Sequence, residues 1–145
     1  MWRELISGLF ADAKFSLPAT ASELERAEAE LRIAFPDELR SLLLETNGVM
    51  AYYSSPLVWP VEEIVTQNRF FRANPDFAEL YMPFDSLLLF GAEGNSDHFG
   101  YSILGGKIRL SSFIYEWDHE SDSRVWFATD LPDYFRRSVP KDEPL

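Results

Sequence analysis

The spacing of apolar residues changes near Pro83 from a helical to a strand pattern, and this change limits what the chain can fold into. Before Pro83, four segments place apolar residues at intervals typical of helices with one buried face. After it, short apolar runs alternate with glycines and acids, which is typical of strands and turns. One helical segment follows near Thr129. This order predicts an α+β fold, in which N-terminal helices and a C-terminal helix pack on a largely antiparallel β-sheet.

Local signals place most of the helix ends. The sequence TASE, from Thr20 to Glu23, matches a capping box, so a helix is expected to begin there. Pro36 suits the first turn of a third helix, and Asn47-Gly48 is expected to end it. A fourth helix is expected over residues 60–72. Residues 73–82 are expected to be irregular, because prolines interrupt the pattern.

The strands are expected mainly in the second half of the chain. One short strand is expected at the end of residues 49–59, and Gly105-Gly106 is a tight-turn signal between two later strands. The length and the lack of a linker or repeat predict a single domain over residues 1–145. The strands expected after Pro83 are Leu87–Phe90, Phe99–Ile103, Lys107–Leu110, Phe113–Trp117 and Arg124–Phe127.

The charge balance limits the partners. The chain has 13 Lys and Arg against 24 Asp and Glu, a net charge of −11. Such a field repels nucleic acid and anionic membranes and attracts basic proteins. The absence of cysteine excludes thiol catalysis, cysteine zinc sites and disulfides. No apolar run is long enough to span a membrane, and the first ten residues do not resemble a secretory signal, so a cytoplasmic protein is expected.

Two acidic loops carry both histidines of the chain. Asp97-His98 closes the loop between the first two strands after Pro83, and Asp118-His119-Glu120 opens an acidic turn that ends at Asp122. These side chains could supply oxygen and nitrogen ligands, so a metal-dependent hydrolase is one hypothesis. However, adjacent residues on a strand point to opposite faces, and the turn lacks the spacing of a calcium loop. We therefore expect no metal site.

Other catalytic patterns are missing from the sequence. It contains no Gly-x-Ser-x-Gly motif and no cysteine nucleophile. The glycines at Gly91–Gly94 and Gly105-Gly106 lack the spacing and the lysine of a phosphate-binding loop. Nothing indicates that two carboxylates are buried at the separation that glycoside hydrolysis needs. No catalytic residue and no cofactor are therefore expected.

The acids and aromatic residues are instead typical of a surface that binds a protein. Exposed aromatic residues beside acids have the composition of a protein–protein hot spot. Tyr52 and Tyr53 follow a glycine-capped helix end and are expected to be exposed, whereas Trp117 lies on the core side if Glu116 faces water. The expected partner contacts are Glu93, Asn95, Asp97, Glu116, Asp118, Glu120 and Asp122, with Tyr52, Tyr53 and Trp117 as anchors.

A series of motifs runs in order from about Phe15 to Phe135. These motifs are Leu17-Pro18, Phe35-Pro36-Asp37-Glu38-Leu39-Arg40, Thr46-Asn47-Gly48, Trp59-Pro60-Val61-Glu62-Glu63-Ile64, Asn68, Leu87–Gly91, Asn95–Tyr101 and Glu116–Glu120. Their order and spacing resemble the SUKH superfamily. That superfamily includes the fungal cell-wall-synthesis regulators of the Smi/Knr type and many bacterial immunity proteins.

The resemblance implies a non-enzymatic α+β domain that binds proteins. In bacteria such domains are antidotes encoded beside polymorphic toxins, often nucleases, so the expected function is an immunity protein that neutralises a basic toxin domain. An alternative, by analogy with the fungal relatives, is an intracellular regulator or scaffold that binds host proteins. The superfamily diverges most at its binding surface, so the resemblance implies no particular contact residue.

Overall fold

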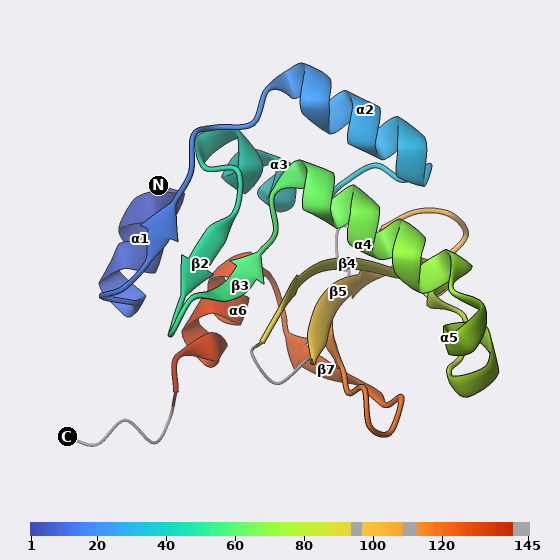
Figure 1. The fold of residues 1–145 in the computed structure, drawn as a ribbon. Coiled ribbons are helices and arrows are strands. Elements are labelled where there is room, and N and C mark those ends of the chain that lie inside the picture. The colour runs from blue at the N-terminus through green and yellow to red at the C-terminus, as the bar shows by residue number, and fades with distance from the viewer. Residues whose placement is uncertain (94–96, 109–112, 141–145) are drawn as a thin grey trace.

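Helices and strands follow the expected order in the computed structural model, which describes residues 1–93, 97–108 and 113–140 (Figure 1). The fold is α+β, as predicted, and no helix among these residues is long and apolar enough to cross a membrane. The elements are α1 (Trp2–Leu9), β1 (Lys14–Phe15), α2 (Ala21–Leu31), α3 (Asp37–Glu45), β2 (Val49–Ala51), β3 (Ser55–Val58), α4 (Val61–Ala73), α5 (Pro75–Leu80), the 3₁₀ helix η1 (Phe84–Ser86), β4 (Leu87–Ala92), β5 (His98–Ser102), β6 (Ile114–Trp117), β7 (Arg124–Ala128) and α6 (Leu131–Ser138).

The strands form two antiparallel sheets rather than the one sheet that the sequence predicts. One has the order β1-β2-β3, and the other is the meander β4-β5-β6-β7. The sequence does not reveal the smaller sheet, because β1 and β2 have only two and three residues, too few for an alternating pattern. The strand predicted at Lys107–Leu110 is not confirmed: Lys107 only bridges Leu104, and residues 109–110 lie outside the described residues.

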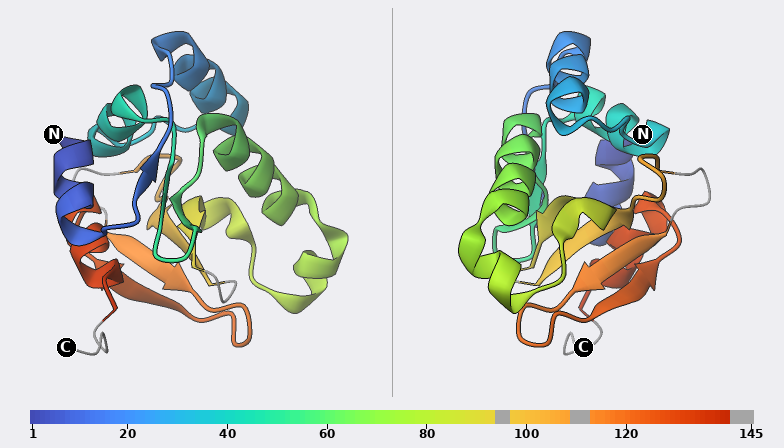
Figure 2. Two further views of the ribbon diagram at one scale, coloured as in Figure 1. Left: turned by 60° about the vertical axis from the view of Figure 1, so that its left-hand side comes forward. Right: turned by 90° about the vertical axis from the view of Figure 1, so that its right-hand side faces the viewer.

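Helices cover both faces of the four-stranded sheet. Figure 2 shows α4 and α5 on one side of the sheet and α6 on the other. Phe71 of α4 packs edge-on against Trp117 of β6, with 5.5 Å between ring centroids. On the opposite face, Tyr134 of α6 packs against Phe99 of β5 at 5.1 Å. Because both faces are covered, all six residues of β4 are buried.

Side-chain hydrogen bonds cap the starts of α2 and α4, and the sequence predicts the first of these caps. The capping box of α2 is confirmed: the Glu23 N–H donates to Thr20 Oγ1 at 3.1 Å, and the Thr20 N–H donates to Glu23 Oε1 at 3.0 Å. Asn47 Oδ1 accepts from the Val61 N–H at 2.8 Å and so caps α4. Gly48 follows with φ of 105°, and a Cβ there would lie 3.0 Å from the Pro60 nitrogen. These contacts join the end of α3 to the start of α4.

Residues 73–82 were predicted to be irregular, and this prediction is wrong. Pro75 opens the short helix α5, and Asn74 caps it by accepting from the Asp76 N–H at 2.9 Å. A proline at the first helical position loses no hydrogen bond, because that N–H has no partner inside the helix. The same residue that signals a break therefore also suits a helix start.

The outer edge of β4 is completed by contacts from outside the four-stranded sheet. The amide of Asn68, which is 1% exposed, donates to the Leu89 carbonyl at 2.8 Å and accepts from the Leu89 N–H at 2.9 Å. Arg72, also on α4, donates to the Leu87 carbonyl at 3.0 Å. The Trp59 N–H donates to the Phe90 carbonyl at 2.8 Å. Buried backbone groups need such partners, so α4 takes the place of a further strand.

The two sheets meet where Gly91 passes Leu57. A Cβ on Gly91 would lie 2.0 Å from the Leu57 carbonyl oxygen, so only glycine fits. The same carbonyl accepts from the Tyr134 hydroxyl at 2.7 Å. The contacts of the Leu57 carbonyl thus hold β3, β4 and α6 together at one point.

A half-buried carboxylate connects α3 to the sheet and to α6. Glu38 accepts from the Tyr101 hydroxyl at 2.7 Å and from the Leu131 N–H at 3.1 Å, at the first turn of α6. Burial raises the pKa of Glu38, although both hydrogen bonds act to lower it. An anion at a helix N-terminus also interacts favourably with the helix dipole.

Asn68→Ala should destabilise the protein by about 3 kcal/mol, because it leaves the buried N–H and C=O of Leu89 without partners. Thr66→Ala, on the exposed face of the same helix, should change the free energy of unfolding by less than about 0.5 kcal/mol. Urea unfolding of both variants measures the difference. Equal stability of the two variants would contradict the role assigned to Asn68.

Candidate functional site

The pairing of β5 with β6 brings the two acidic loops together. His98 of β5 lies opposite Trp117 of β6 in an antiparallel register. Asp97 precedes His98 and Asp118 follows Trp117, so the two aspartates lie just beyond the last pair of this ladder. The sequence alone does not specify this register.

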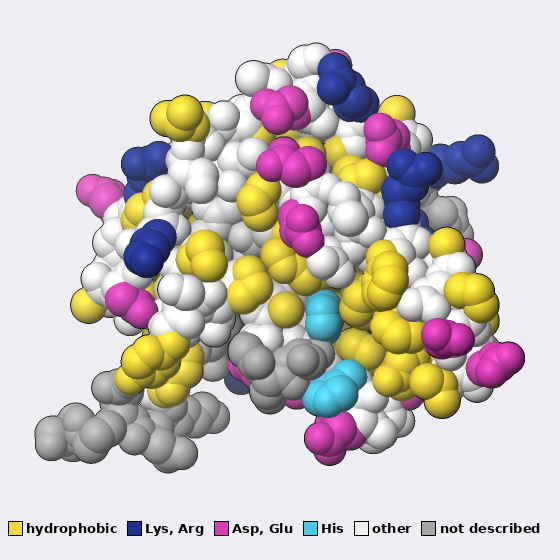
Figure 3. Space-filling view, in the orientation of Figure 1, with side chains coloured by type: hydrophobic (Ala, Val, Ile, Leu, Met, Phe, Trp, Pro, Cys, Tyr) yellow, Lys and Arg dark blue, Asp and Glu magenta, His cyan; other side chains and the backbone are white. Residues whose placement is uncertain are grey.

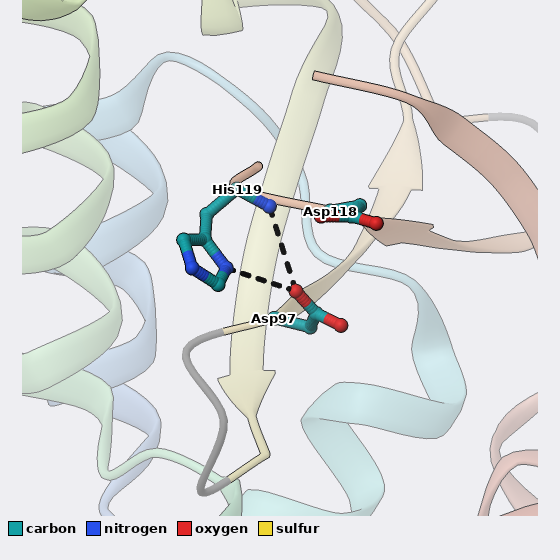
Figure 4. A group of neighbouring side chains, drawn as sticks. All are labelled: Asp97, Asp118 and His119. Carbon is teal, nitrogen blue, oxygen red and sulfur yellow. Dashed lines mark hydrogen bonds and ion pairs between the residues drawn. The ribbon is translucent and has the colours of Figure 1, made fainter. Parts of the chain in front are cut away.

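Asp97 and His119 hold the loops in contact. His119 Nδ1 lies 3.2 Å from Asp97 Oδ1, and the His119 N–H donates to the same oxygen at 3.4 Å. Figure 4 shows the imidazole of His119 turned toward Asp97, with Asp118 beside it. The Asp97 side chain is 15% exposed and that of His119 is 39% exposed. Asp97 therefore joins the loops, while Glu120, with a side chain 82% exposed, extends from the turn into solvent.

Three carboxylates, two from the β4–β5 loop and one from β6, crowd beside this contact. Glu93, Asp97 and Glu116 each offer an oxygen, and these oxygens lie within 4.8 Å of one another. Burial raises the pKa of Glu116 to about 7, and the neighbouring charges of Glu93, Asp97 and Asp118 add to the effect. Burial, followed by repulsion from Asp97, also raises the pKa of Glu93. We refer to Glu93, Asp97, Glu116, Asp118 and Glu120 as the acidic face.

The acidic face also has the donor atoms of a metal site. Asp97, Asp118 and His119 form a second group whose ligand atoms lie within 4.8 Å, and it shares Asp97 with the first. Carboxylate and imidazole groups at such separations can coordinate a divalent cation. All of these residues are partly exposed, and acidic surface groups commonly cluster without an ion. The geometry permits a cation here but does not require one.

Asp122 and Trp117 serve the fold rather than the surface. Trp117 is 3% exposed, and its Nε1–H donates to Asp122 Oδ1 at 2.8 Å. Asp122 also accepts from the Met82 N–H at 2.9 Å and from Arg124 at 3.2 Å. Burial acts to raise the pKa of Asp122, but these hydrogen bonds outweigh it and the pKa is lowered. Trp117 is therefore a core residue and cannot anchor a partner without rearrangement.

Tyr52 and Tyr53 are exposed but lie apart from the acidic face. Tyr52 is 39% exposed and Tyr53 is 85% exposed, in the turn between β2 and β3. Both have positive φ and donate their N–H groups to the Asp12 carboxylate at 2.9 Å. Figure 1 shows this turn on the opposite side of the molecule from the β6–β7 turn. Asn95, the remaining predicted contact, lies outside the described residues.

The sequence reasoning missed the apolar surface beside the acidic face. Phe70, Leu80 and Met82 are 53%, 70% and 57% exposed, on and around α5. The Tyr81 hydroxyl donates to the His119 carbonyl at 2.8 Å, which joins this segment to the acidic turn. The available signal was the concentration of large apolar residues in residues 73–82, the stretch predicted to be irregular because of Pro75 and Pro83.

A comparison with protein families agrees with the resemblance drawn from the motifs. A family model described as SUKH_6: SMI1-KNR4 cell-wall matches residues 21–135. The matched span includes α2, α3, both sheets except β1, and most of α6. A search of curated proteins found no match.

The raised pKa of Glu116 predicts how stability depends on pH. The folded protein keeps this proton up to about pH 7, whereas a glutamate with the ordinary pKa of 4.5 loses it earlier, so stability falls as pH rises between these values. Glu116→Gln should therefore stabilise the protein at pH 8 by about 1 kcal/mol, after allowance for solvent screening, and have little effect at pH 5. Thermal unfolding across this range measures the difference.

Glu120→Gln is the matched control for Glu116→Gln, since it removes the same charge from a side chain that is 82% exposed. Its effect on stability should be small and should vary little between pH 5 and pH 8. If both variants gained the same stability at pH 8, burial of Glu116 would not be the cause.

Proposed function

The chain belongs to the SMI1-KNR4 (SUKH) family, and from this we propose that it is a non-enzymatic immunity protein that binds and neutralises a basic toxin domain. The observation that carries the proposal is the convergence of two acidic loops at the Asp97–His119 contact. This contact brings acids from two separate loops into one anionic surface. Family membership is consistent with an antidote role, and the charged surface supplies a means of recognition.

The electrostatics of the acidic face favour a cationic partner. Burial is the main cause of the raised pKa values of Glu93 and Glu116, and repulsion from the neighbouring carboxylates, Asp97 among them, adds to it. A Lys or Arg placed among these carboxylates would relieve their mutual repulsion and favour their charged forms. The net charge of −11 would also steer a basic domain toward the chain and speed association.

A nuclease toxin would fit this surface, because nucleases present basic surfaces to phosphate. The acidic face would then occupy the region that otherwise binds nucleic acid. The chain itself, with its excess of acids, is proposed to bind neither nucleic acid nor membrane, and to meet its partner in the cytoplasm. This mode of action needs no catalytic residue and no cofactor.

Affinity capture from the native host is the first test. We expect one partner in stoichiometric amount, a large exported protein retained through its C-terminal domain, as identified by mass spectrometry. Expression of that domain alone should stop growth, and co-expression of the chain should restore it. Several substoichiometric cytosolic partners and no protection would instead favour an intracellular regulator or scaffold.

Charge reversal tests whether the acidic face makes the contact. The triple variant Glu93→Lys, Glu116→Lys and Glu120→Lys should lower the association rate with the captured domain about 10-fold at low salt and weaken its salt dependence. Glu4→Lys, Glu25→Lys and Glu62→Lys, at exposed positions on α1, α2 and α4, replace the same number of glutamates by lysine and are the control. Stopped-flow binding at two salt concentrations measures both. Equal effects of the two triple variants would refute a role for the acidic face in particular.

A further inference from the structure

We infer that the surface of α5 forms the apolar centre of the same docking site, and that its partner presents an apolar side chain flanked by Lys or Arg. This inference rests on the proposed function and adds to it where the binding energy comes from. We refer to Phe70, Phe77, Leu80, Tyr81 and Met82 as the α5 patch. Figure 3 shows apolar side chains gathered over α5, next to the histidines.

The α5 patch exposes apolar groups that the fold does not need to expose. No residue of α5 is buried, and Phe70, Leu80 and Met82 are each more than half exposed. The aromatic members form a continuous surface, because the rings of Phe70 and Phe77 are 5.5 Å apart and those of Phe77 and Tyr81 are 5.4 Å apart. Contiguous apolar groups with a polar rim are characteristic of protein interaction sites.

A buried aromatic layer supports the patch from below. The Phe77 ring packs edge-on against Phe71 at 5.1 Å, and the Tyr81 ring packs against Trp117 at 5.0 Å. Trp117 in turn packs against the buried Phe84 at 5.1 Å. Aromatic side chains that are already fixed lose little conformational entropy on binding, which is why such residues dominate interface energetics. The buried Trp117 therefore acts as a support for surface residues.

Three hydrogen bonds attach the patch to the β6–β7 turn and to the start of β7. The Tyr81 hydroxyl donates to the His119 carbonyl at 2.8 Å, and the Met82 N–H donates to Asp122 at 2.9 Å. Arg124 donates to the Met82 carbonyl at 2.7 Å. The patch therefore lies directly against the β6–β7 turn, from which Glu120, a member of the acidic face, extends into solvent.

The charges around the patch specify a cationic partner. Asp76 and Glu79 are exposed on α5 itself, and Glu120 extends from the neighbouring turn. Of the nearby cations, Arg124 has a side chain 12% exposed that pairs with Asp122 at 3.2 Å and stacks over Phe84 at 4.6 Å. Arg72 donates to the Leu87 carbonyl, and Arg69, next to Phe70, is exposed but pairs with Glu30 at 3.3 Å. No Lys or Arg occurs between Ala73 and Gly106.

Other occupants fit these charges less well. A second copy of the chain would bring acids against acids, at a net charge of −11 for each copy. An anionic membrane would be repelled for the same reason. A protein that carries Lys or Arg around an apolar side chain satisfies both parts of the surface, since the apolar group supplies affinity and the charges supply orientation and rate.

Synthetic peptides test this chemistry without knowledge of the natural partner. The probes are a Lys/Leu peptide, a Lys/Ser peptide of equal charge, and a Glu/Leu peptide of equal apolar content. We expect the Lys/Leu peptide to bind and to shift the amide NMR signals of residues 76–82 and 118–120. The Lys/Ser peptide should bind at least about 10-fold more weakly, and the Glu/Leu peptide should not bind.

The double variant Leu80→Gln and Met82→Gln should reduce Lys/Leu binding to the level of Lys/Ser binding. Both side chains are exposed, so thermal unfolding should not change; if it does, Phe70→Gln provides the same test on α4. Leu17→Gln, at a side chain 84% exposed before α2, is the control and should bind like the wild type. Unchanged binding by the double variant, or NMR shifts centred on Tyr52 and Tyr53, would overturn the inference.

The two proposals can fail separately. If the chain protects cells from a captured toxin and the double variant protects equally well, the α5 patch is refuted and the immunity function stands. If the peptides bind at the patch and the captured partners are not toxins, the immunity function fails and the docking surface stands.

Discussion

The buried edge of β4 is the constraint on which the rest of the structure depends. This strand is buried along its whole length, so backbone groups on the edge away from β5 must find partners inside the protein. Asn68 and Arg72 supply them from α4, and the Trp59 N–H supplies one from the chain after β3. The need to satisfy these groups fixes α4 against the large sheet and the small sheet against both. The position of α5 follows, because it continues directly from α4.

The same sheet also produces the acidic face, because strand pairing brings two of its loops together. The β5–β6 register places Asp97 beside Asp118, and the Asp97–His119 contact closes the gap between the loops. Crowding carboxylates in partly buried positions costs stability, as the raised pKa of Glu116 indicates. Local departures from the most stable arrangement are common where a protein binds something. A cationic partner would reverse this cost, which links the energetics of the fold to the proposed function.

The acidic face and the α5 patch suit different parts of a binding process. Charges at the rim act over a distance and accelerate encounter, whereas fixed aromatic groups contribute after contact, when water is excluded. Asp122 and Trp117 are largely buried, and they hold the residues of both the acidic turn and the α5 patch in position. Asp122 holds the turn to Met82, and Trp117 supports Tyr81 from below. Asp122 and Trp117, which the sequence predicts as partner contacts, thus support the surface residues from beneath.

The sequence by itself determined the features that arise from near neighbours: the helical faces, the capping box at Thr20, the end of α3 shortly before Asn47-Gly48, the α+β order and the family. Each depends on residues a few positions apart, whose interactions any such sequence would make. Only the tertiary structure decided the two-sheet arrangement, the helix α5, the burial of Trp117 and the meeting of Asp97 with His119. Alternation along a strand shows which residues share a face but not which face is buried, and pairing register depends on contacts between residues far apart in the chain.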